Sequence, residues 1–383
     1  MANMMDYLDW RGDLTLGQAP FNEVDNLILS EISYLDLSNI VPGPEAGESV
    51  TLARAAEGFF DRYAAGEKID MGVVLSDEIP VLLKKLAGTA RFSGMKLSGY
   101  VDHVNAGEGE QFSALTVETG DRQIYCAYRG TDDTLAGWRE DLELACVTAV
   151  PAQKMAAAYL KQSAKAHPRR GIRLGGHSKG GNLAVYAAVF CPRTVQHRIS
   201  SVWSNDGPGF LQSMLELPEY QRVRDRIHTI VPRSSVVGML LEHEERYVVV
   251  DSDQLGVWQH DGFSWQVLGD CFITLPQISQ QASQSSQAVR RWVHSMTVEE
   301  RSRFVDALFR VLTASGAETL SDLKEDNIRA VLPMVRAMKE LDKGTREGVL
   351  EFIQLMVANN TRLVLEDIRE GAEQWRSGNR KNR

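Results

Sequence analysis

Residues 172–188 read I-R-L-G-G-H-S-K-G-G-N-L-A-V-Y-A-A. A short apolar run leads into a G-x-S-x-G motif, Gly176-His177-Ser178-Lys179-Gly180, and then into a helical pattern. A serine in a tight strand-to-helix turn takes strained dihedrals, so the residues two before and two after it must lack bulk. The turn exposes the hydroxyl at the positive end of a helix. The motif therefore predicts Ser178 as a nucleophile, with a glycine-rich phosphate-binding turn as the alternative.

Composition narrows the class of protein. The chain has 383 residues, 43% hydrophobic and 24% charged, which is typical of a globular protein with one large domain and an appendage. The formal net charge is −9, and no long basic patch points to nucleic acid as a partner. Four scattered cysteines without a C-x-x-C pair argue against a disulfide framework and a zinc site. We therefore expect no metal and no organic cofactor.

The N-terminal stretch M-A-N-M-M-D-Y-L-D-W carries acids where a signal peptide would carry lysine or arginine. No segment approaches 18 uninterrupted apolar residues, so no transmembrane segment is expected. These features predict a soluble, cytoplasmic protein.

Periodicity divides the chain into helices, then strands, then alternating elements. We expect an irregular start over residues 1–20 and three N-terminal helices, beginning at Asn22, Thr51 and Ser76. Strands are predicted near 96–104, 111–118, 122–129, 172–175, 201–204, 228–231 and 247–250. The first three favour an antiparallel beginning, and helices between the later ones indicate a parallel sheet covered on both faces. The predicted fold class is α/β.

Beyond residue 275 the pattern becomes helical. A polar stretch over 277–287 is either a linker or the start of a helix, and Thr297 begins a capping box. Further helices are expected over 319–341 and 345–372. We therefore predict a hydrolase domain over 1–274 and a C-terminal helical region over 275–383. An apolar stripe in the last helix indicates core or a dimer seam, which would allow a homo-oligomer.

A serine nucleophile needs a base, an orienting acid and donors for the oxyanion. The segment C-A-Y-R-G-T ends a predicted strand, and Gly130 lets the backbone turn so that Thr131 can face the serine. The second donor would be the backbone N–H of Lys179. A plain strand-ending turn at Gly130 is the alternative.

The combination of Y-R-G-T-D, then Trp138 and Asp141, then G-H-S-x-G resembles the class 3 lipases of the α/β-hydrolase superfamily over about residues 115–265. More closely, M-D-Y-L-D-W-R-G-D, N-D-G-P-G-F, S-S-V-V-G-M-L-L and Q-H-D-G-F-S-W are similar to a bacterial family, the Mbeg-like proteins, over about residues 3–270. The resemblance implies the α/β-hydrolase fold, Ser178 as nucleophile and Thr131 in the oxyanion hole. It supplies no substrate.

In this fold the base lies downstream of the serine. The histidines there are His197, His228, His243, His260 and His294. His260 is favoured because turn residues flank it after the last strand-like run, as in class 3 lipases. His197 and His228 are expected to be structural, and His243 is expected in a solvated loop among glutamates.

The acid is where the sequence departs from class 3 lipases, which carry an aspartate near a Val-Pro. Here Val231-Pro232 is followed by serines. Asp206, in N-D-G-P-G-F, ends the preceding strand, and pancreatic-type lipases present their acid at a similar turn. The alternatives are an Asx-turn role for Asp206, an acid at Asp251 or Asp253, or an incomplete triad.

Two segments near the motif stay open. The Lys179 side chain is expected to be solvated, with attraction of a carboxylate-bearing substrate as the alternative. Residues 210–223 form either a lid or the helix between two strands. The sequence predicts a serine hydrolase that cleaves a small-molecule or lipid acyl ester, or a thioester. The alternative is a catalytically weak or inactive hydrolase-fold protein that binds a ligand or a protein partner.

Overall fold

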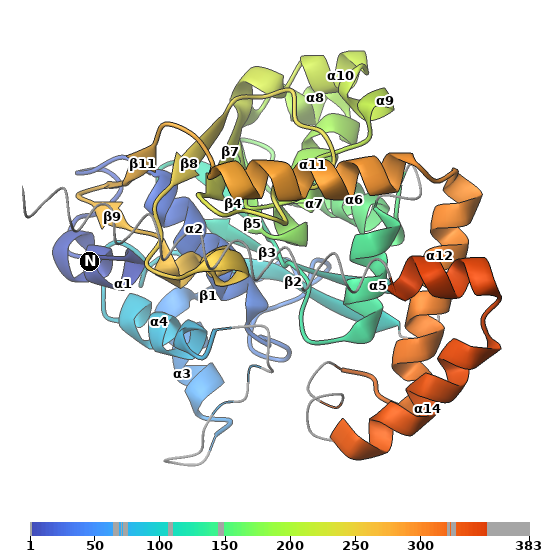
Figure 1. Ribbon diagram of the computed structural model, residues 1–383. Coiled ribbons are helices and arrows are strands. Elements are labelled where there is room, and N and C mark those ends of the chain that lie inside the picture. The colour runs from blue at the N-terminus through green and yellow to red at the C-terminus, as the bar shows by residue number, and fades with distance from the viewer. Residues whose placement is uncertain are drawn as a thin grey trace, which may run out of the picture.

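The computed structural model describes residues 2–63, 69, 71, 76–105, 110–144, 149–319, 322 and 327–350. A nine-stranded sheet lies at its centre, in the order β1-β2-β3-β4-β5-β6-β7-β8-β11 (Figure 1). The strands are β1 Val50–Thr51, β2 Lys96–Asn105, β3 Glu110–Glu118, β4 Gln123–Tyr128, β5 Gly171–His177, β6 Ile199–Asn205, β7 Ile227–Pro232, β8 Tyr247–Val250 and β11 Thr274–Leu275. Strands β4 to β8 pair in parallel, and the pairs on either side are antiparallel. The predicted α/β class and its antiparallel beginning are confirmed.

The strand order explains why the sheet needs helices from two parts of the chain. Neighbouring parallel strands joined in chain order by right-handed crossovers place their connecting helices on one face. That face carries α6 Pro151–Ala166, α7 Lys179–Phe190 and α8 Arg193–Gln196. The other face is covered by α1 Met4–Arg11, α2 Glu23–Glu31, α3 Leu52–Phe60 and α4 Glu78–Ala87. Along β4, Tyr125 packs in the core on the N-terminal helices and Cys126 in the core on the opposite face.

The expectation of an irregular start was wrong over residues 4–11. The Asn3 side chain accepts the Met5 N–H, while Asp6 accepts the Asn3 N–H, and this capping box starts α1. The predicted cap at Asn22 is confirmed, and a short 3-10 helix, η1 Ile32–Tyr34, continues α2 toward the sheet. The short N-x-x-D spacing at residue 3 is a cap signal, although Gly12, Gly17 and Pro20 punctuate the stretch that follows.

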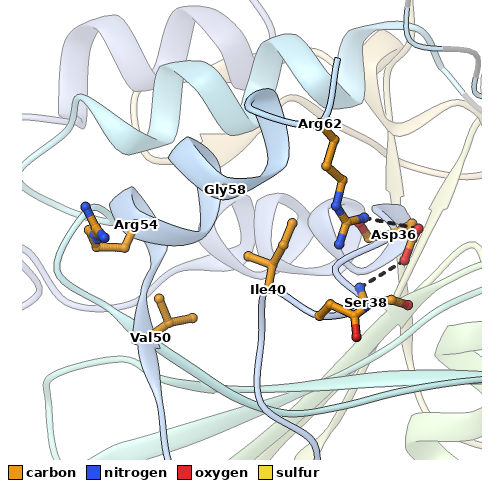
Figure 2. Close-up of a pocket in the computed structure, with 8 residues that line it drawn as sticks. Asp36, Ser38, Ile40, Val50, Arg54, Gly58 and Arg62 are labelled. Carbon is orange, nitrogen blue, oxygen red and sulfur yellow. Dashed lines mark hydrogen bonds and ion pairs between the residues drawn. The ribbon is translucent and has the colours of Figure 1, made fainter. Parts of the chain in front are cut away.

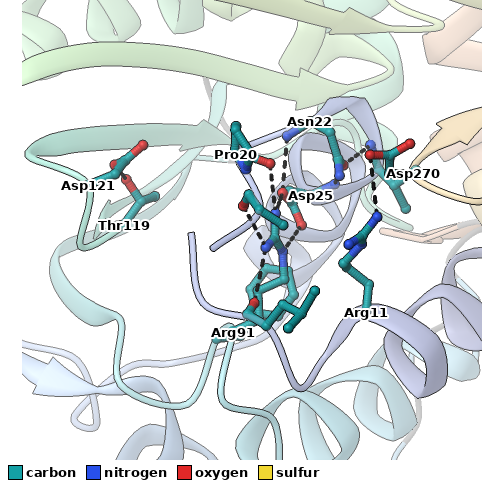
Figure 3. Close-up of polar contacts among 12 residues, drawn as sticks. Arg11, Pro20, Asn22, Asp25, Arg91, Thr119, Asp121 and Asp270 are labelled. Carbon is teal, nitrogen blue, oxygen red and sulfur yellow. Dashed lines mark hydrogen bonds and ion pairs between the residues drawn. The ribbon is translucent and has the colours of Figure 1, made fainter. Parts of the chain in front are cut away.

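A buried ion pair anchors the N-terminal segment (Figure 3). The Asp25 and Arg91 side chains are both 0% exposed, and Arg91 Nε donates to Asp25 Oδ1 at 2.7 Å. Arg91 Nη2 also donates to Asp25 Oδ2, and the other three guanidinium hydrogens reach the carbonyls of Leu14, Ala19 and Pro20. Because every charge has a partner, the pair tolerates removal from water and fixes α2 against the chain that follows α4.

The C-terminal helices begin after the last strand. They are α11 Gln280–His294, α12 Val298–Leu312 and α14 Asn327–Glu340. The capping box at Thr297 is confirmed, and residues 277–287 include the polar start of α11. In Figure 1, α12 lies beside α5 Leu135–Glu143, where Leu135 shares a core with Phe304 and Leu308, and α14 packs on α12. Of the helix expected over 345–372, residues from 351 onward lie outside the described part.

Residues 210–223 form a packed crossover between β6 and β7. They contain two short helices, α9 Gln212–Leu215 and α10 Pro218–Gln221, in place of one continuous helix. Phe210, Met214 and Tyr220 are buried in the core between the sheet and helices α6, α7 and α8. Their burial fits the crossover interpretation of this segment.

Candidate active site

The carboxyl ends of β5 and β6 present the first two candidate residues. Ser178 follows β5 with φ 56° and ψ −132°, and Asp206 follows β6 with φ 49°. Such conformations cost non-glycine residues about 1–3 kcal/mol and are concentrated at functional sites. A Cβ on Gly176 would collide with the Gly180 backbone, and one on Gly180 with the Tyr128 carbonyl. The motif's glycines are thus required by close packing around the turn.

The structure brings His260 to Asp206. His260 Nδ1 lies 2.6 Å from Asp206 Oδ2, with the histidine side chain 27% exposed and the aspartate 1% exposed. The carboxylate only accepts, so Nδ1 carries the hydrogen, and in a neutral imidazole Nε2 then keeps its lone pair. His260 ends the 3-10 helix η3 Gly256–His260, in the turn predicted from the sequence. An imidazole in this state can accept a proton at Nε2.

Two donors hold the other oxygen of Asp206. Ser235 Oγ donates to Asp206 Oδ1 at 2.5 Å, and the Gly238 N–H donates to the same oxygen at 3.1 Å. Ser235 lies in the stretch after Val231-Pro232 where class 3 lipases are expected to carry their acid. Here that stretch supplies a hydroxyl donor, and the carboxylate stands at the end of the neighbouring strand. The alternatives Asp251 and Asp253 make no hydrogen bond to a described histidine.

His177, directly before Ser178, packs against His260. Their ring centroids are 4.5 Å apart, and His177 Nε2 donates to the His260 carbonyl at 2.7 Å. Burial, followed by the neighbouring His260, lowers the pKa of His177 to about 3, so the ring is neutral near pH 7. Its free Nδ1 can then accept from Tyr34 Oη at 3.2 Å. This contact places the His260 loop next to the serine turn.

Ser178 itself is half-buried, and its hydroxyl makes no hydrogen bond within the described part of the chain. The Cα of Gly130 lies close beside it, because a Cβ there would stand 3.2 Å from Ser178 Cβ and 2.6 Å from the His177 carbonyl oxygen. Thr131 follows Gly130 directly in the chain, so it continues from a segment that contacts the serine turn. The absence of a hydrogen bond at the Ser178 hydroxyl is compatible with a catalytic role, because catalytic hydrogen bonds in unliganded enzymes are often long and tighten only with substrate.

Thr131 is held by Asp141 from helix α5. Thr131 Oγ1 donates to Asp141 Oδ2 at 2.6 Å, while Asp141 Oδ1 is buried and lacks a hydrogen-bond partner among the described residues. Burial raises the pKa of Asp141 to about 6, although Lys179 and the Thr131 hydroxyl both act to lower it. The pair leaves the Thr131 backbone N–H available for another acceptor.

The expectation of a solvated Lys179 side chain was wrong. It is 1% exposed, and its Nζ lies 2.9 Å from Glu140 Oε2, 2.6 Å from Gln111 Oε1 and 3.2 Å from the Gln111 carbonyl oxygen. A lysine flanked by Ser178 and two glycines has no local cue for burial, because both partners come from distant parts of the chain. Its backbone N–H still begins α7, directly after the serine.

The other histidines do not join the site. His243 was expected in a solvated loop, but its side chain is 7% exposed, with Nδ1 2.9 Å from Glu245 Oε1 and Nε2 2.6 Å from the Gly238 carbonyl oxygen. His228 stacks on Trp203 within the sheet, and His197 ends α8, as expected. The side chain of His294 lies outside the described atoms.

Sequence reasoning missed the supports of the site. Tyr34, Gln111, Glu140 and Ser235 all contact proposed catalytic elements from distant segments, and none belongs to a recognisable motif. For Ser235 one signal existed: a serine pair at the position where the acid was missing. A hydroxyl there is a natural donor to a carboxylate that has moved to the adjacent strand.

A hollow of about 470 Å³ lies between the chain at 36–40 and helix α3 (Figure 2). Arg54, Arg62 and Asp36 line it, and Arg62 pairs with Asp36 at 3.2 Å. None of the proposed catalytic residues contributes to it. Within the described ranges, no group of three or more His, Cys, Asp or Glu is placed to hold a metal ion. None of the helices seen there is long and apolar enough to cross a membrane.

The chain is similar to several solved structures at low sequence identity. Nonglycosylated Yarrowia lipolytica LIP2 lipase is 13% identical with a TM-score of 0.37, covering 67% of this chain and 84% of that one. A mutant form of MDLA from Penicillium cyclopium is 11% identical with a TM-score of 0.36, covering 65% and 83%. Rhizomucor miehei lipase in its propeptide complex is 16% identical with a TM-score of 0.31, covering 41% and 57%, so this chain spans under two thirds of it.

No curated protein matches the chain in sequence. A family model does match: the one described as Mbeg1-like covers residues 86–310, more than half of the chain. That range includes β2 to β8, the serine turn, Asp206 and His260. With a mostly parallel sheet and a serine turn after β5, the chain has an α/β-hydrolase fold and belongs to the Mbeg1-like family.

Proposed function

We propose that the protein is a serine hydrolase that cleaves a carboxylic ester or thioester through an acyl-enzyme. Ser178 is the nucleophile, His260 the general base and Asp206 the orienting acid. The observation that carries the proposal is the 2.6 Å hydrogen bond from His260 Nδ1 to Asp206 Oδ2, at the strand ends where Ser178 adopts its strained turn. Three such groups at one edge of a parallel sheet are the arrangement that acyl transfer requires.

In the first step Ser178 Oγ bonds to the acyl carbon, and its proton moves to His260 Nε2. Asp206 stabilises the resulting imidazolium without taking the proton. Collapse of the tetrahedral intermediate breaks the bond to the leaving alcohol or thiol, which receives the proton from Nε2. Water then repeats the sequence on the acyl-enzyme and releases the acid.

The oxyanion is assigned to two backbone donors, the N–H of Thr131 and the N–H of Lys179. The proximity of Gly130 to Ser178 and the Thr131–Asp141 hydrogen bond support the first. The position of Lys179 at the first turn of α7 supports the second. Fixed donors of this kind stabilise charge that develops only in the transition state.

The alternative of a binding protein rested on the missing acid near Ser235. Asp206 now offers a carboxylate hydrogen-bonded to His260, with Ser235 as its donor, so hydrolysis is the function that the geometry favours. The substrate class, a small-molecule or lipid acyl ester, and any homo-oligomer through the C-terminal helices stay predictions. So does the expectation of a cytoplasmic location.

A panel of p-nitrophenyl esters graded by chain length tests the proposal. Wild-type protein is expected to hydrolyse at least one ester, and Ser178→Ala and His260→Ala are each expected to reduce kcat by several orders of magnitude. His197→Ala serves as the control, because His197 lies at the end of α8. Equal rates for the wild type and Ser178→Ala would overturn the proposal.

A further inference from the structure

We propose that the buried side chain of Lys179 is a positioning residue that couples the two halves of the oxyanion hole. Its backbone N–H is one proposed donor, and its ammonium is connected by two separate routes to Thr131, the other donor. The inference rests on the proposed hydrolase function for its catalytic meaning. The connections themselves are contacts between buried groups of β3, α5 and α7.

The first route runs through Gln111 on β3. Lys179 Nζ can only donate, so Gln111 Oε1, 2.6 Å away, must be the amide oxygen. This fixes the amide so that Nε2 faces the Gly130 carbonyl oxygen at 3.4 Å. In a trans peptide the N–H points opposite to the carbonyl, so this contact turns the Thr131 N–H away from Gln111. Gln111 is 1% exposed, which leaves its amide few other partners.

The second route runs through α5. Lys179 Nζ lies 2.9 Å from Glu140 Oε2, and both side chains are essentially buried, at 1% and 0% exposure. Glu140 Oε1 also accepts the Ala152 N–H at 2.9 Å, which joins α5 to the start of α6. The next residue, Asp141, accepts from Thr131 Oγ1. A charge at Nζ therefore fixes the helical turn that holds the Thr131 side chain.

A contribution to folding stability does not by itself explain why Lys179 and Glu140 form a buried ion pair. Replacing a buried ion pair with neutral groups of similar volume is often neutral or stabilising, whereas removing one partner strands a buried charge. A pair that only stabilised the fold would therefore be expendable as a pair. A pair that positions Thr131 would not be, because misplacement of a reacting or stabilising group by about 1 Å can cost about 10²-fold in rate.

The test compares Lys179→Met with the double variant Lys179→Met/Glu140→Gln. The double variant carries no stranded charge, and Gln at 140 can still accept the Ala152 N–H. We expect it to unfold near the wild-type temperature yet to lose about 10²-fold in kcat, with KM changed by less than about threefold. Amide hydrogen exchange over residues 129–134 is measured on the same proteins. Exchange there is expected to quicken in the double variant, since Arg129 and Thr134 N–H are hydrogen-bonded in this loop.

Asp25→Asn is the matched control, because it breaks another fully buried ion pair, with Arg91, outside the site. It is expected to lower stability and leave kcat and exchange over 129–134 unchanged. If wild type hydrolyses esters and the double variant keeps its kcat, the coupling is wrong and the proposed function stands. If wild type hydrolyses nothing, the proposed function fails, and unchanged exchange in the double variant would separately overturn the coupling.

Discussion

Replacing Asp206 with asparagine should move the proton of the neutral His260 ring from Nδ1 to Nε2. Asp206 Oδ1 accepts from both Ser235 Oγ and the Gly238 N–H, so the single oxygen of an asparagine would remain with those two donors. Its amide nitrogen would then face His260 Nδ1, 2.6 Å from the present carboxylate oxygen. An NH₂ group can only donate there, which forces Nδ1 to accept and moves the imidazole proton to Nε2. In that tautomer Nε2 has no lone pair for the Ser178 proton.

The magnitude follows from this tautomer. An aspartate-to-asparagine change that leaves the geometry intact but fixes the wrong tautomer lowers kcat by about 10⁴-fold in a serine hydrolase. That ratio corresponds to about 5.5 kcal/mol of transition-state stabilisation. Because Ser235 and Gly238 hold the asparagine oxygen firmly, we expect a loss of about 10³–10⁴-fold, with KM nearly unchanged.

Steady-state hydrolysis of the best p-nitrophenyl ester measures the effect, with a urea melt to show that the variant is folded. Asp253→Asn is the control, because Asp253 is an exposed aspartate near the same loop and an alternative candidate for the acid. A kcat for Asp206→Asn within about tenfold of wild type, or a larger loss in Asp253→Asn, would show that Asp206 does not set the tautomer of His260.

Three further outcomes follow from the contacts around the site. Burial raises the pKa of Asp141 from 3.8 to about 6, so its contribution to stability is present below about pH 4 and lost as pH rises through about 6. The loss in the free energy of unfolding between about pH 4 and 6 is about 3 kcal/mol. Urea melts over this pH range should show a smaller loss for Asp141→Asn than for wild type, and an equal loss in the two proteins would contradict this assignment. Ser235→Ala should lower kcat about tenfold by removing a donor to the Asp206 carboxylate, with Ser235→Thr near wild type, and equal rates for both would argue against this role. Gly130→Ala should cost about 1–3 kcal/mol in urea melts, because its Cβ would meet Tyr34 Oη and the His177 carbonyl oxygen, whereas Gly348→Ala, with open space at its Cβ, should be harmless.

Local sequence signals were sufficient for the strands and for the residues at their ends. Alternation and glycine punctuation predicted β2 to β8 within a few residues, since each strand carries its own period. Ser178, Asp206 and His260 each stand in a turn recognisable from its immediate neighbours. The structure places the last two in direct contact, which single-sequence reasoning could only favour over Asp251 and Asp253.

Local sequence signals did not predict which side chains from distant segments contact Lys179 and His243. Lys179 and His243 were both expected to be solvated because their neighbours in sequence are glycines or glutamates. Their burial depends on groups from elsewhere in the chain: Glu140 for Lys179, and Thr229 and Tyr220 around the Glu245 that pairs with His243. The counter-charge of Lys179 comes from another helix, and the groups that close over the His243–Glu245 pair come from another strand and helix, so a local window of sequence does not show that either side chain is buried.

Covalent labelling shows whether Ser178 is a nucleophile and whether His260 activates it. Wild-type protein is incubated with a fluorophosphonate probe, and the modified peptide is located by mass spectrometry. We expect one adduct on Ser178, lost in Ser178→Ala and formed far more slowly in His260→Ala than in His243→Ala. No adduct on the folded wild type, or an adduct that persists in Ser178→Ala, would contradict it.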